Sequence, residues 1–327
     1  MRVTIKEVAK LAGVSPSTVT RVVQNKSTIS EETKKRVRAA MKKLDYHPNL
    51  NARSLVSQST QVICLVLPDD SDVFYQNPFF PTVLRGISQV ASDYDYAIQI
   101  STGQDEKHRL ENIKQMIFGK RVDGLIFLYS KPNDPLVEFA VSNQFPFLIL
   151  GKAVLPFISL VDNDNIKAGY DATKYFIDQG YRKIAFLAGN KELVVSQDRF
   201  AGYKQALKEA AIPLNESLVK FSFGFLLEDS IYKSMEKMPI NEIEAFVTSD
   251  SMAAEGALQY LKDKDQQLPI ITFDSIKPRI DVEAYIDINA IELGKESFRT
   301  LFQIIKDSKE NKHICYRQLI QHTIITR

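Results

Sequence analysis

Small hydroxyl side chains and one arginine are grouped at residues 15–21, close to the start of the chain. Hydroxyls donate and accept hydrogen bonds, and an arginine can donate two parallel hydrogen bonds to the edge of a guanine. Val19, Val22 and Val23 recur among them at helical spacing, which gives a helix one apolar and one polar face. A helix with this polar face fits the major groove of DNA. The sequence predicts that the DNA-facing residues here are Ser15, Pro16, Ser17, Thr18, Thr20 and Arg21.

Two helices joined by a short turn are needed to position that polar face. Thr4 and Glu7 form a capping-box pattern, so a first helix is expected to start at Ile5 and to end at Gly13. Ser15 is expected to cap a second helix whose first residue, Pro16, needs no hydrogen-bond partner for its nitrogen. This order of elements is a helix-turn-helix.

A third helix and a local excess of positive charge complete this N-terminal segment. Ser30 is expected to cap the helix, and Val37, Ala40, Met41 and Leu44 form its apolar stripe. Twelve basic and four acidic residues give residues 1–58 a net charge of +8, whereas the whole chain carries +2, so residues 59–327 carry −6. A positive field confined to one segment is typical of phosphate binding.

The remainder of the chain alternates short apolar runs with amphipathic segments, which predicts an α/β fold. The strands are expected at residues 62–67, 96–101, 123–128, 145–150, 183–188, 244–249 and 268–273. The helices are expected at residues 79–92, 106–118, 164–179, 199–211, 251–262 and 290–307. About 270 residues suit two doubly wound parallel sheets better than one, with the chain crossing between lobes near residues 162–164, 288–289 and 319. A ligand is then expected at the carboxyl ends of the strands, between the lobes.

Known catalytic and phosphate-binding motifs are absent from the sequence, so we expect neither an enzyme nor a bound cofactor. His313, Cys315 and His322 could be drawn together as metal ligands, but a solvated strand edge is the preferred interpretation and no metal site is predicted. Cys64 and Cys315 are expected to be ordinary strand residues. The start MRVTIKEVAK lacks an apolar signal segment and no apolar run is long enough for a membrane helix, so a cytoplasmic protein is expected.

The run VTIKEVAKLAGVSPSTVTRVVQNKSTISEETKKRVRAAMKKLDYHPNLNARSLVSQST resembles the head and hinge of the lactose-repressor/galactose-repressor family of bacterial transcription regulators. The resemblance continues through NPFFPTVLRGI, VDGLIFL, VDNDNIKAGYDAT, DRFAGYKQAL and TSDSMAAEG, and so covers essentially the whole chain. Within the family, LVLPDDSDVFYQNPFFPTVLRGISQVAS, GKRVDGLIFLY, FPFLILGK and NKHICYRQLI are most similar to regulators of maltose operons.

The resemblance implies how the chain is divided. Residues 1–48 would be the helix-turn-helix head and residues 49–60 a hinge helix and linker. Residues 61–161 with 290–319 would form the first lobe of a core that is similar to periplasmic binding proteins. Residues 162–289 with 320–327 would form the second lobe, for effector binding and dimerisation.

The resemblance also implies contacts with DNA outside the second helix. Thr4, Asn25 and Asn49 would belong to the DNA interface. In the hinge, Leu55 would enter the minor groove and partly unstack a base step, with Ala52 on the same face and Arg53 near the DNA backbone. Composition alone favours a plain linker for residues 50–56, because so short a helix is unstable by itself in water.

The effector site is implied by residues at strand ends and helix starts. Arg199, expected to open its helix, matches the family arginine that binds the effector, and Asp274 matches the carboxylate that acts with it. Phe80 matches the family's aromatic ring, although Phe79 and Phe80 could exchange the ring and core roles. Asp250 is expected either to bind ligand or to cap the following helix. Further effector residues are Asp69 and Phe225, with Asp70, Tyr75, Phe157 and Asp164 as second choices.

Three positions depart from the family pattern. Pro16 replaces a larger polar residue and cannot hydrogen-bond to a base edge, so Ser17 and Arg21 are expected to carry more of the base recognition. The run Thr272-Phe273-Asp274 stands where many members have Gly-Tyr-Asp, and Ser230 stands where many have glycine. The last two changes bear on the shape of the effector site.

The resulting functional hypothesis is a homodimeric repressor that binds a pseudo-palindromic double-stranded operator and responds to a small sugar, namely maltose or a maltodextrin. A global carbon-catabolite regulator that responds to a phosphorylated partner protein is an alternative from the same family. A two-lobed sugar-binding transport protein is disfavoured by the basic head and the missing signal segment.

Overall fold

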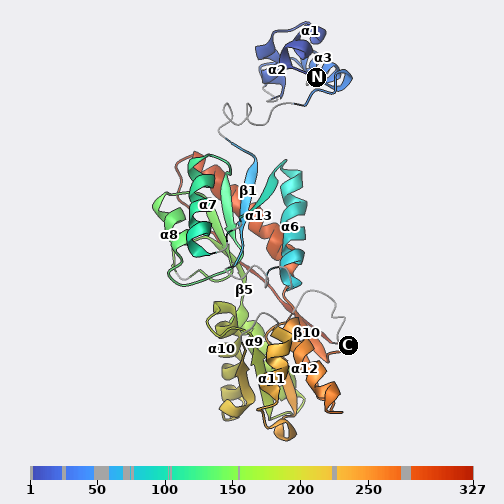
Figure 1. Ribbon diagram of the computed structural model, residues 1–327, viewed down its shortest axis with the longest axis vertical. Coiled ribbons are helices and arrows are strands. Elements are labelled where there is room, and N and C mark those ends of the chain that lie inside the picture. Colours follow the sequence, from blue (N-terminus) through green and yellow to red (C-terminus); the bar gives the residue numbers. More distant parts are fainter. Residues whose placement is uncertain are drawn as a thin grey trace. The chain divides into compact units, whose positions relative to one another are not determined.

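The computed structural model describes residues 3–23, 27–47, 59–68, 74, 77–101, 103, 105–153, 155–222, 227–273 and 281–326. The chain forms two compact units, Met1–Thr60 and Gln61–Arg327 (Figure 1). Within the described part of the chain, no helix is both long and apolar enough to cross a membrane.

The described residues of the first unit form three helices: α1 (Ile5–Ala12), α2 (Pro16–Val23) and α3 (Glu31–Lys43). Val8, Val19 and Val37, one from each helix, are fully buried at the centre of their common core. The predicted caps are confirmed. Thr4 and Glu7 form the capping box of α1, Gly13 takes the left-handed conformation after it, and the Ser30 side chain accepts the Thr33 N–H at the start of α3.

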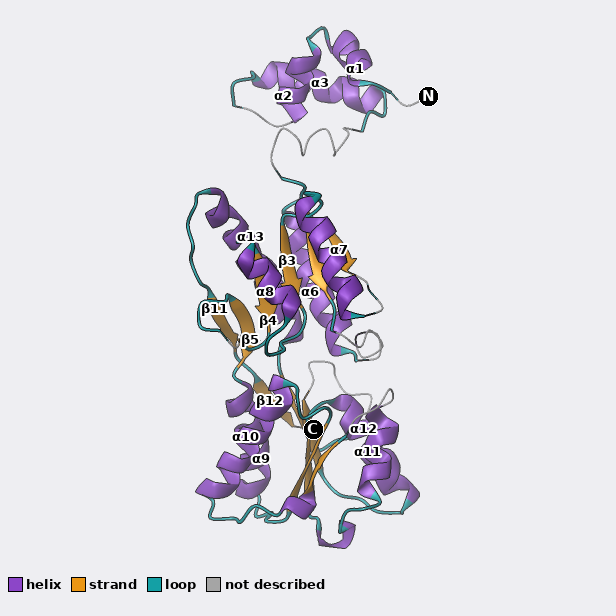
Figure 2. Ribbon diagram, turned by 60° about the vertical axis from the view of Figure 1, so that its left-hand side comes forward, coloured by secondary structure: helices purple, strands orange, loops and turns teal. Residues whose placement is uncertain are grey.

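The second unit contains two six-stranded sheets, each with helices on both faces (Figure 2). The first sheet has the order β11-β5-β4-β3-β1-β2 and all its pairings are parallel. Its strands are β1 (Val62–Val66), β2 (Ala97–Ser101), β3 (Gly124–Phe127), β4 (Phe147–Leu150), β5 (Leu160–Asn163) and β11 (Arg317–Ile320). Helices α6 (Phe79–Asp93) and α13 (Ala290–Lys309) pack on one face, and α7 (Glu106–Phe118) and α8 (Pro135–Ser142) on the other. We call this sheet and its helices the first lobe.

The second sheet has the order β12-β10-β9-β8-β6-β7. Its strands are β6 (Ile184–Ala188), β7 (Val219–Phe221), β8 (Ala245–Thr248), β9 (Ile270–Phe273), β10 (Ala284–Asp287) and β12 (Thr323–Thr326). One face is covered by α9 (Asn165–Asp178) and α10 (Val194–Glu209), and the other by α11 (Leu227–Met235) and α12 (Ser251–Asp263). Short 3₁₀ turns lie at Glu216–Leu218 and Ile240–Glu242. This sheet and its helices form the second lobe.

The α/β fold class with two doubly wound sheets is confirmed, with one departure from parallel pairing. Strand β12 runs antiparallel to β10 at the edge of the second sheet. The chain leaves β10 for α13 and β11 in the first lobe and returns only two residues after β11, so β12 enters the second sheet at the end where β10 leaves it, with Thr323 beside Asp287.

Pairs of glycines bring two helices close together in each lobe. A side chain on Gly86 or Gly294 would overlap the backbone of the facing helix, α13 or α6. Gly169 and Gly202 serve α9 and α10 in the same way: a Cβ on Gly169 would overlap the Arg199 carbonyl, and a Cβ on Gly202 would overlap the Ile166 carbonyl. Because these glycines lack a Cβ, the starts of α9 and α10 lie side by side.

Candidate DNA interface and effector site

The head presents the polar face that the sequence predicts. Ser15, Pro16, Ser17 and Arg21 are exposed, while Val19 and Val22 are buried beneath them. Ser15 Oγ accepts the Thr18 N–H at 3.2 Å and lies 2.8 Å from Ser17 Oγ. Ser15 therefore caps α2, as predicted.

Local hydrogen bonds occupy several of the candidate hydroxyls. Thr20 Oγ1 donates to the Pro16 carbonyl at 3.1 Å, and Thr18 Oγ1 lies 2.9 Å from Ser15 Oγ. Thr4 Oγ1 donates to Glu7 Oε2 at 2.9 Å, and the Thr4 N–H bonded to the same carboxylate lowers the pKa of Glu7. The exposed candidates are Thr4, Ser15, Pro16, Ser17 and Arg21, and the Ser17 hydroxyl is itself in contact with Ser15 Oγ. Asn25, Asn49, Ala52, Arg53 and Leu55 lie outside the described residues.

Arg199 lies inside α10 and does not open the helix, which corrects the sequence-based expectation. The helix starts at Val194, one turn earlier than residue 199. Leu193 precedes it without a capping side chain, so the usual start signal is missing. Arg199 is only 7% exposed, and its guanidinium points toward the ends of neighbouring second-lobe strands.

Among the described residues, Asn165, Ser249 and Phe273 contact the Arg199 guanidinium. Its Nε–H donates to Asn165 Oδ1 at 3.0 Å, and Nη1 donates to the carbonyl of Ser249, which follows β8. The Phe273 ring, at the end of β9, lies 4.1 Å from the guanidinium carbon. A cation over an aromatic face is stabilised electrostatically, so Phe273 supports the charge as well as the position.

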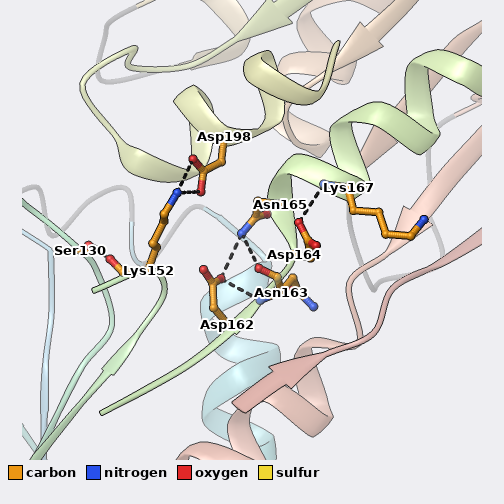
Figure 3. Close-up of polar contacts among 8 residues, drawn as sticks. All are labelled: Ser130, Lys152, Asp162, Asn163, Asp164, Asn165, Lys167 and Asp198. Carbon is orange, nitrogen blue, oxygen red and sulfur yellow. Dashed lines mark hydrogen bonds and ion pairs between the residues drawn. The ribbon is translucent and has the colours of Figure 1, made fainter. Parts of the chain in front are cut away.

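Next to this arginine, Asp162 is the penultimate residue of β5 in the first lobe. Its Oδ1 accepts the Asn163 N–H at 2.8 Å and Asn165 Nδ2–H at 3.0 Å (Figure 3). Burial raises the pKa of Asp162 to about 6, although these hydrogen bonds and the charge of Arg199 act in the opposite direction. Desolvation of the carboxylate therefore outweighs its local stabilisation.

Asn163 connects the three places where the chain passes between the lobes. It is the last residue of β5, and its Nδ2 donates to the Ile288 carbonyl at 3.0 Å and to the Ile320 carbonyl at 2.8 Å. Ile288 lies between β10 and α13, and Ile320 ends β11 just before β12. One buried amide thus joins all three connections.

A further contact between the lobes is an ion pair. Lys152, which follows β4, places Nζ 2.9 Å and 3.0 Å from the two carboxylate oxygens of Asp198 on α10 (Figure 3). Ser130 Oγ donates to the Lys152 carbonyl and fixes the backbone from which the lysine extends. Asp198 is the residue before Arg199, so this ion pair is made by the same helical turn that carries the arginine.

The structure assigns capping roles to two predicted carboxylates. Asp250 Oδ1 accepts the Ala253 N–H at 2.9 Å and Oδ2 accepts Ser249 Oγ–H at 2.8 Å, so it caps α12. Asp164 accepts the Lys167 N–H at 2.9 Å and caps α9. Capping was one of the two roles foreseen for Asp250.

The two neighbouring phenylalanines differ in burial. Phe80 is 8% exposed and belongs to the first-lobe core, next to Phe74 and Phe79. Phe79 is half-buried and packs against the cores of both lobes. Phe157 is 60% exposed. Asp69, Asp70, Tyr75, Phe225 and Asp274 lie outside the described residues.

The described residues contain no group of three or more potential metal ligands. Cys315 and Cys64 are free thiols, and Cys64 is buried, which raises the pKa of its thiol to about 12. His322 Nε2 lies 2.9 Å from Asp171 Oδ2, while the Cys315 thiol faces the Pro156 carbonyl.

Sequence reasoning missed the residues that surround Arg199. Asn165 stands in the run Asp162-Asn163-Asp164-Asn165, which directly follows a strand, and polar residues at that place were a usable signal. Lys152 and Asp198 carried no such signal, because their contact joins residues 46 positions apart.

Comparison with known proteins agrees with this architecture. Residues 4–49 match the model of bacterial regulatory proteins of the lacI family. Residues 60–326 match the model of periplasmic binding proteins and the sugar binding domain of the LacI family.

Individual relatives match over the full length. The chain is 60% identical to the HTH-type transcriptional regulator MalR of Streptococcus pneumoniae serotype 4, over 100% of both chains. A solved complex of the transcriptional regulator CelR with cellobiose has a TM-score of 0.74 at 25% identity, covering 100% of this chain and 99% of that one. The lac repressor dimer bound to operator and the anti-inducer ONPF shares the fold, with a TM-score of 0.82 at 21% identity over 100% and 98% of the two chains.

These relatives are transcription regulators and not enzymes, in agreement with the prediction from the sequence. The helix-turn-helix head, the two-lobed core and the full-length matches lead to one conclusion: the chain belongs to the lacI family of bacterial regulatory proteins.

Proposed function

We propose that this transcription regulator is a homodimeric, cytoplasmic repressor of a maltose or maltodextrin operon, and that the sugar binds beside Arg199 and releases the operator. The observation that carries the proposal is the buried Arg199, fixed by Asn165, Ser249 and Phe273 next to the segment that joins the lobes. A guanidinium held in this way suits the hydroxyl oxygens of a sugar. The 60% identity with a MalR regulator over the whole length favours maltose, and for this reason the catabolite-regulator alternative is not adopted.

The proposed site combines described and undescribed residues. Arg199 and Asp274 would bind sugar hydroxyls. Asp250 would bind a sugar hydroxyl through Oδ2, which would then give up its hydrogen bond from Ser249 Oγ–H. Phe80 would pack against a sugar ring, and the half-buried Phe79 is the alternative ring. Asp69 and Phe225 would complete the site.

The proposed DNA interface is the exposed face of α2. Ser17 and Arg21 would contact base edges, with Ser15, Pro16, Thr18, Thr20, Thr4, Asn25 and Asn49 around them. Leu55, with Ala52 and Arg53, would act in the minor groove as the hinge of a dimer. A pseudo-palindromic operator then provides one half-site for each head.

Sugar and DNA are coupled in this proposal because each prefers a different arrangement of the lobes. The coupling is reciprocal, so the operator must weaken sugar binding by the same factor by which the sugar weakens operator binding. A shift from 1:99 to 99:1 between the two states needs a difference in affinity of about 5.5 kcal/mol.

Calorimetric titration tests the effector. Maltose, maltotriose, glucose and cellobiose are titrated into the parent protein, into Arg199→Ala and into Arg182→Ala, which removes an exposed arginine of the same lobe. We expect maltose or maltotriose to bind the parent and Arg182→Ala alike and to bind Arg199→Ala at least tenfold more weakly. Failure of all four sugars to bind the parent contradicts the effector assignment, and normal binding by Arg199→Ala contradicts the site.

A further inference from the structure

Asn165 occupies the first position of α9 and touches both the arginine and the end of the first sheet. It is 5% exposed. Its Oδ1 accepts the Arg199 Nε–H at 3.0 Å, while its Nδ2 donates to Asp162 Oδ1 at 3.0 Å and lies 3.4 Å from the Asn163 carbonyl. Figure 3 shows the amide directed toward Asp162 and Asn163.

These partners require a side chain at position 165 that can both accept and donate, and the Asn165 amide does so. Arg199 can only donate, and an ionised Asp162 can only accept, so the side chain between them must accept on one side and donate on the other. An aspartate would place a second carboxylate against Asp162. A leucine, which has a similar shape, would leave both partners without their bond to this residue, and unmade bonds of buried polar groups are costly.

Helix packing and a helix cap hold the backbone around Asn165. Gly169 and Gly202 let α9 and α10 approach until the Gly169 Cα faces the Arg199 carbonyl. The Asp164 cap fixes the first turn of α9 through the Lys167 N–H. The position of the Asn165 amide is therefore determined by packing, and the guanidinium takes its orientation from that amide.

We propose that Asn165 is a positioning residue for effector binding: it fixes the plane of the Arg199 guanidinium and links that group to Asp162 at the end of the first sheet. This inference rests on the proposed function, because it assigns Arg199 to the effector. It adds a route for coupling: a displacement of Arg199 by the sugar is transmitted through one amide to the strand where the chain passes between the lobes.

The charged groups around this amide determine how a variant responds to pH. Asp162 is the penultimate residue of β5, Arg199 and Asp198 lie on α10, Lys152 follows β4, Asp164 caps α9, and Lys167 and Asp171 lie on α9. In Asn165→Asp, the carboxyl at position 165 would face the carboxyl of Asp162. When this pair takes up one proton, the protonated oxygen can again donate a hydrogen bond to the other carboxylate. This variant should therefore recover at acidic pH, whereas Asn165→Leu has no such means of recovery.

Two measurements test the inference. The first is titration of maltose and maltotriose at pH 7.5 and pH 5.5 into the parent, Asn165→Leu and Asn165→Asp. Asn143→Leu and Asn143→Asp are matched controls, since Asn143 is exposed at the end of α8 and bonds only a carbonyl of its own helix among the described residues.

We expect the affinity for sugar at pH 7.5 to fall about tenfold or more in both Asn165 variants, as for loss of a hydrogen bond to a charged group, and to be unchanged in the controls. Relative to the parent, the Asn165→Asp defect should shrink at least threefold at pH 5.5, while the Asn165→Leu defect should persist.

The second measurement needs no ligand. The exchange rate of the Arg199 Nε–H with water is followed by ¹⁵N NMR, with the signal assigned by its loss in Arg199→Ala. We expect slow exchange in the parent and in Asn143→Leu, and at least tenfold faster exchange in Asn165→Leu. Unchanged protection in Asn165→Leu overturns the inference, as does sugar binding by Asn165→Leu equal to that of the parent.

The two proposals fail separately. If no sugar binds the parent, the proposed function fails, and the exchange rate still decides whether Asn165 positions Arg199. If the sugar binds and both Asn165 variants behave as the controls do, the proposed function stands and the role of Asn165 is wrong. If Asn165→Leu does not fold, Asn165→Asp decides, because a defect that is independent of pH overturns the inference.

Discussion

Lys152 and Asp198 form a two-pronged ion pair between the lobes, with Nζ 2.9 Å and 3.0 Å from the two carboxylate oxygens. The lysine side chain is 48% exposed and the aspartate 15%. Because Asp198 is the residue before Arg199, the proposed function implies that the strength of this pair affects how the two lobes respond to the effector.

We expect the Lys152–Asp198 pair to contribute less than about 1 kcal/mol, because a half-exposed pair is screened by water and salt. A double-mutant cycle of Lys152→Ala and Asp198→Ala, followed by urea unfolding at low and high salt, measures it. The exposed pair Lys312–Glu310 is the control and should give a smaller coupling. A coupling energy that salt does not reduce, or that equals the control, contradicts this view of the contact.

Asn163→Ala should destabilise the second unit by about 2 kcal/mol or more. It removes both donated bonds and leaves the Ile288 and Ile320 carbonyls without this donor. Urea unfolding checks the prediction, with Asn143→Ala as the exposed control. If the two alanine variants have equal unfolding midpoints, the joining of the three connections by Asn163 has no energetic importance.

Asp162 should make stability fall as the pH rises. Its pKa is about 6 in the folded chain against 3.8 for the ordinary group, so the folded state binds the proton more tightly than the unfolded state. The resulting stabilisation is full below about pH 4 and is lost as the pH rises through about 6. In urea unfolding from pH 4 to pH 7, Asp162→Asn should therefore gain stability relative to the parent with increasing pH. A stability difference that is constant over this range argues against the raised pKa.

Substitutions in the head should separate base recognition from general DNA affinity. Arg21→Ala should cost about 1 to 3 kcal/mol and relax the preference at one base position in each half-site. Lys6→Ala should weaken binding to all sequences alike, because a phosphate contact carries no base information. Fluorescence anisotropy with a library of half-site variants distinguishes them. Equal losses on every sequence for both variants would remove Arg21 from base recognition.

Local signals in the sequence predicted much of the fold. The caps at Thr4, Ser15 and Ser30 each involve residues three positions apart, and the structure confirms them. The runs that form β1, β2, β3, β4, β6, β8 and β9 were also predicted. All of these strands except the edge strand β2 are buried along most of their length, and strands buried on both faces are continuous in apolar residues. Strand β5 was missed, since half of it is Asp162 and Asn163, and the exposed strands β11 and β12 carry no buried run.

The candidate site was less accessible from the sequence. Arg199 and Asp250 stood out because each was expected where a strand passes into a helix. Asp250 does lie there, but Arg199 lies inside α10, whose start was misplaced because it has no capping side chain. The partners of Arg199 come from positions 34 and 50 residues away, and only the packed sheets and the α9–α10 contact bring them together. Contacts between residues so far apart in the sequence leave no local sequence pattern from which they could be predicted.

Operator binding with and without sugar tests the central claim most directly. The affinity of a pseudo-palindromic operator is measured in the absence and presence of saturating maltose, for the parent and for Arg199→Ala. We predict that maltose weakens operator binding by the parent, and that Arg199→Ala binds the operator as the parent does but no longer responds to maltose. A parent whose operator affinity is unaffected by maltose, or an Arg199→Ala variant that responds normally, would contradict the account.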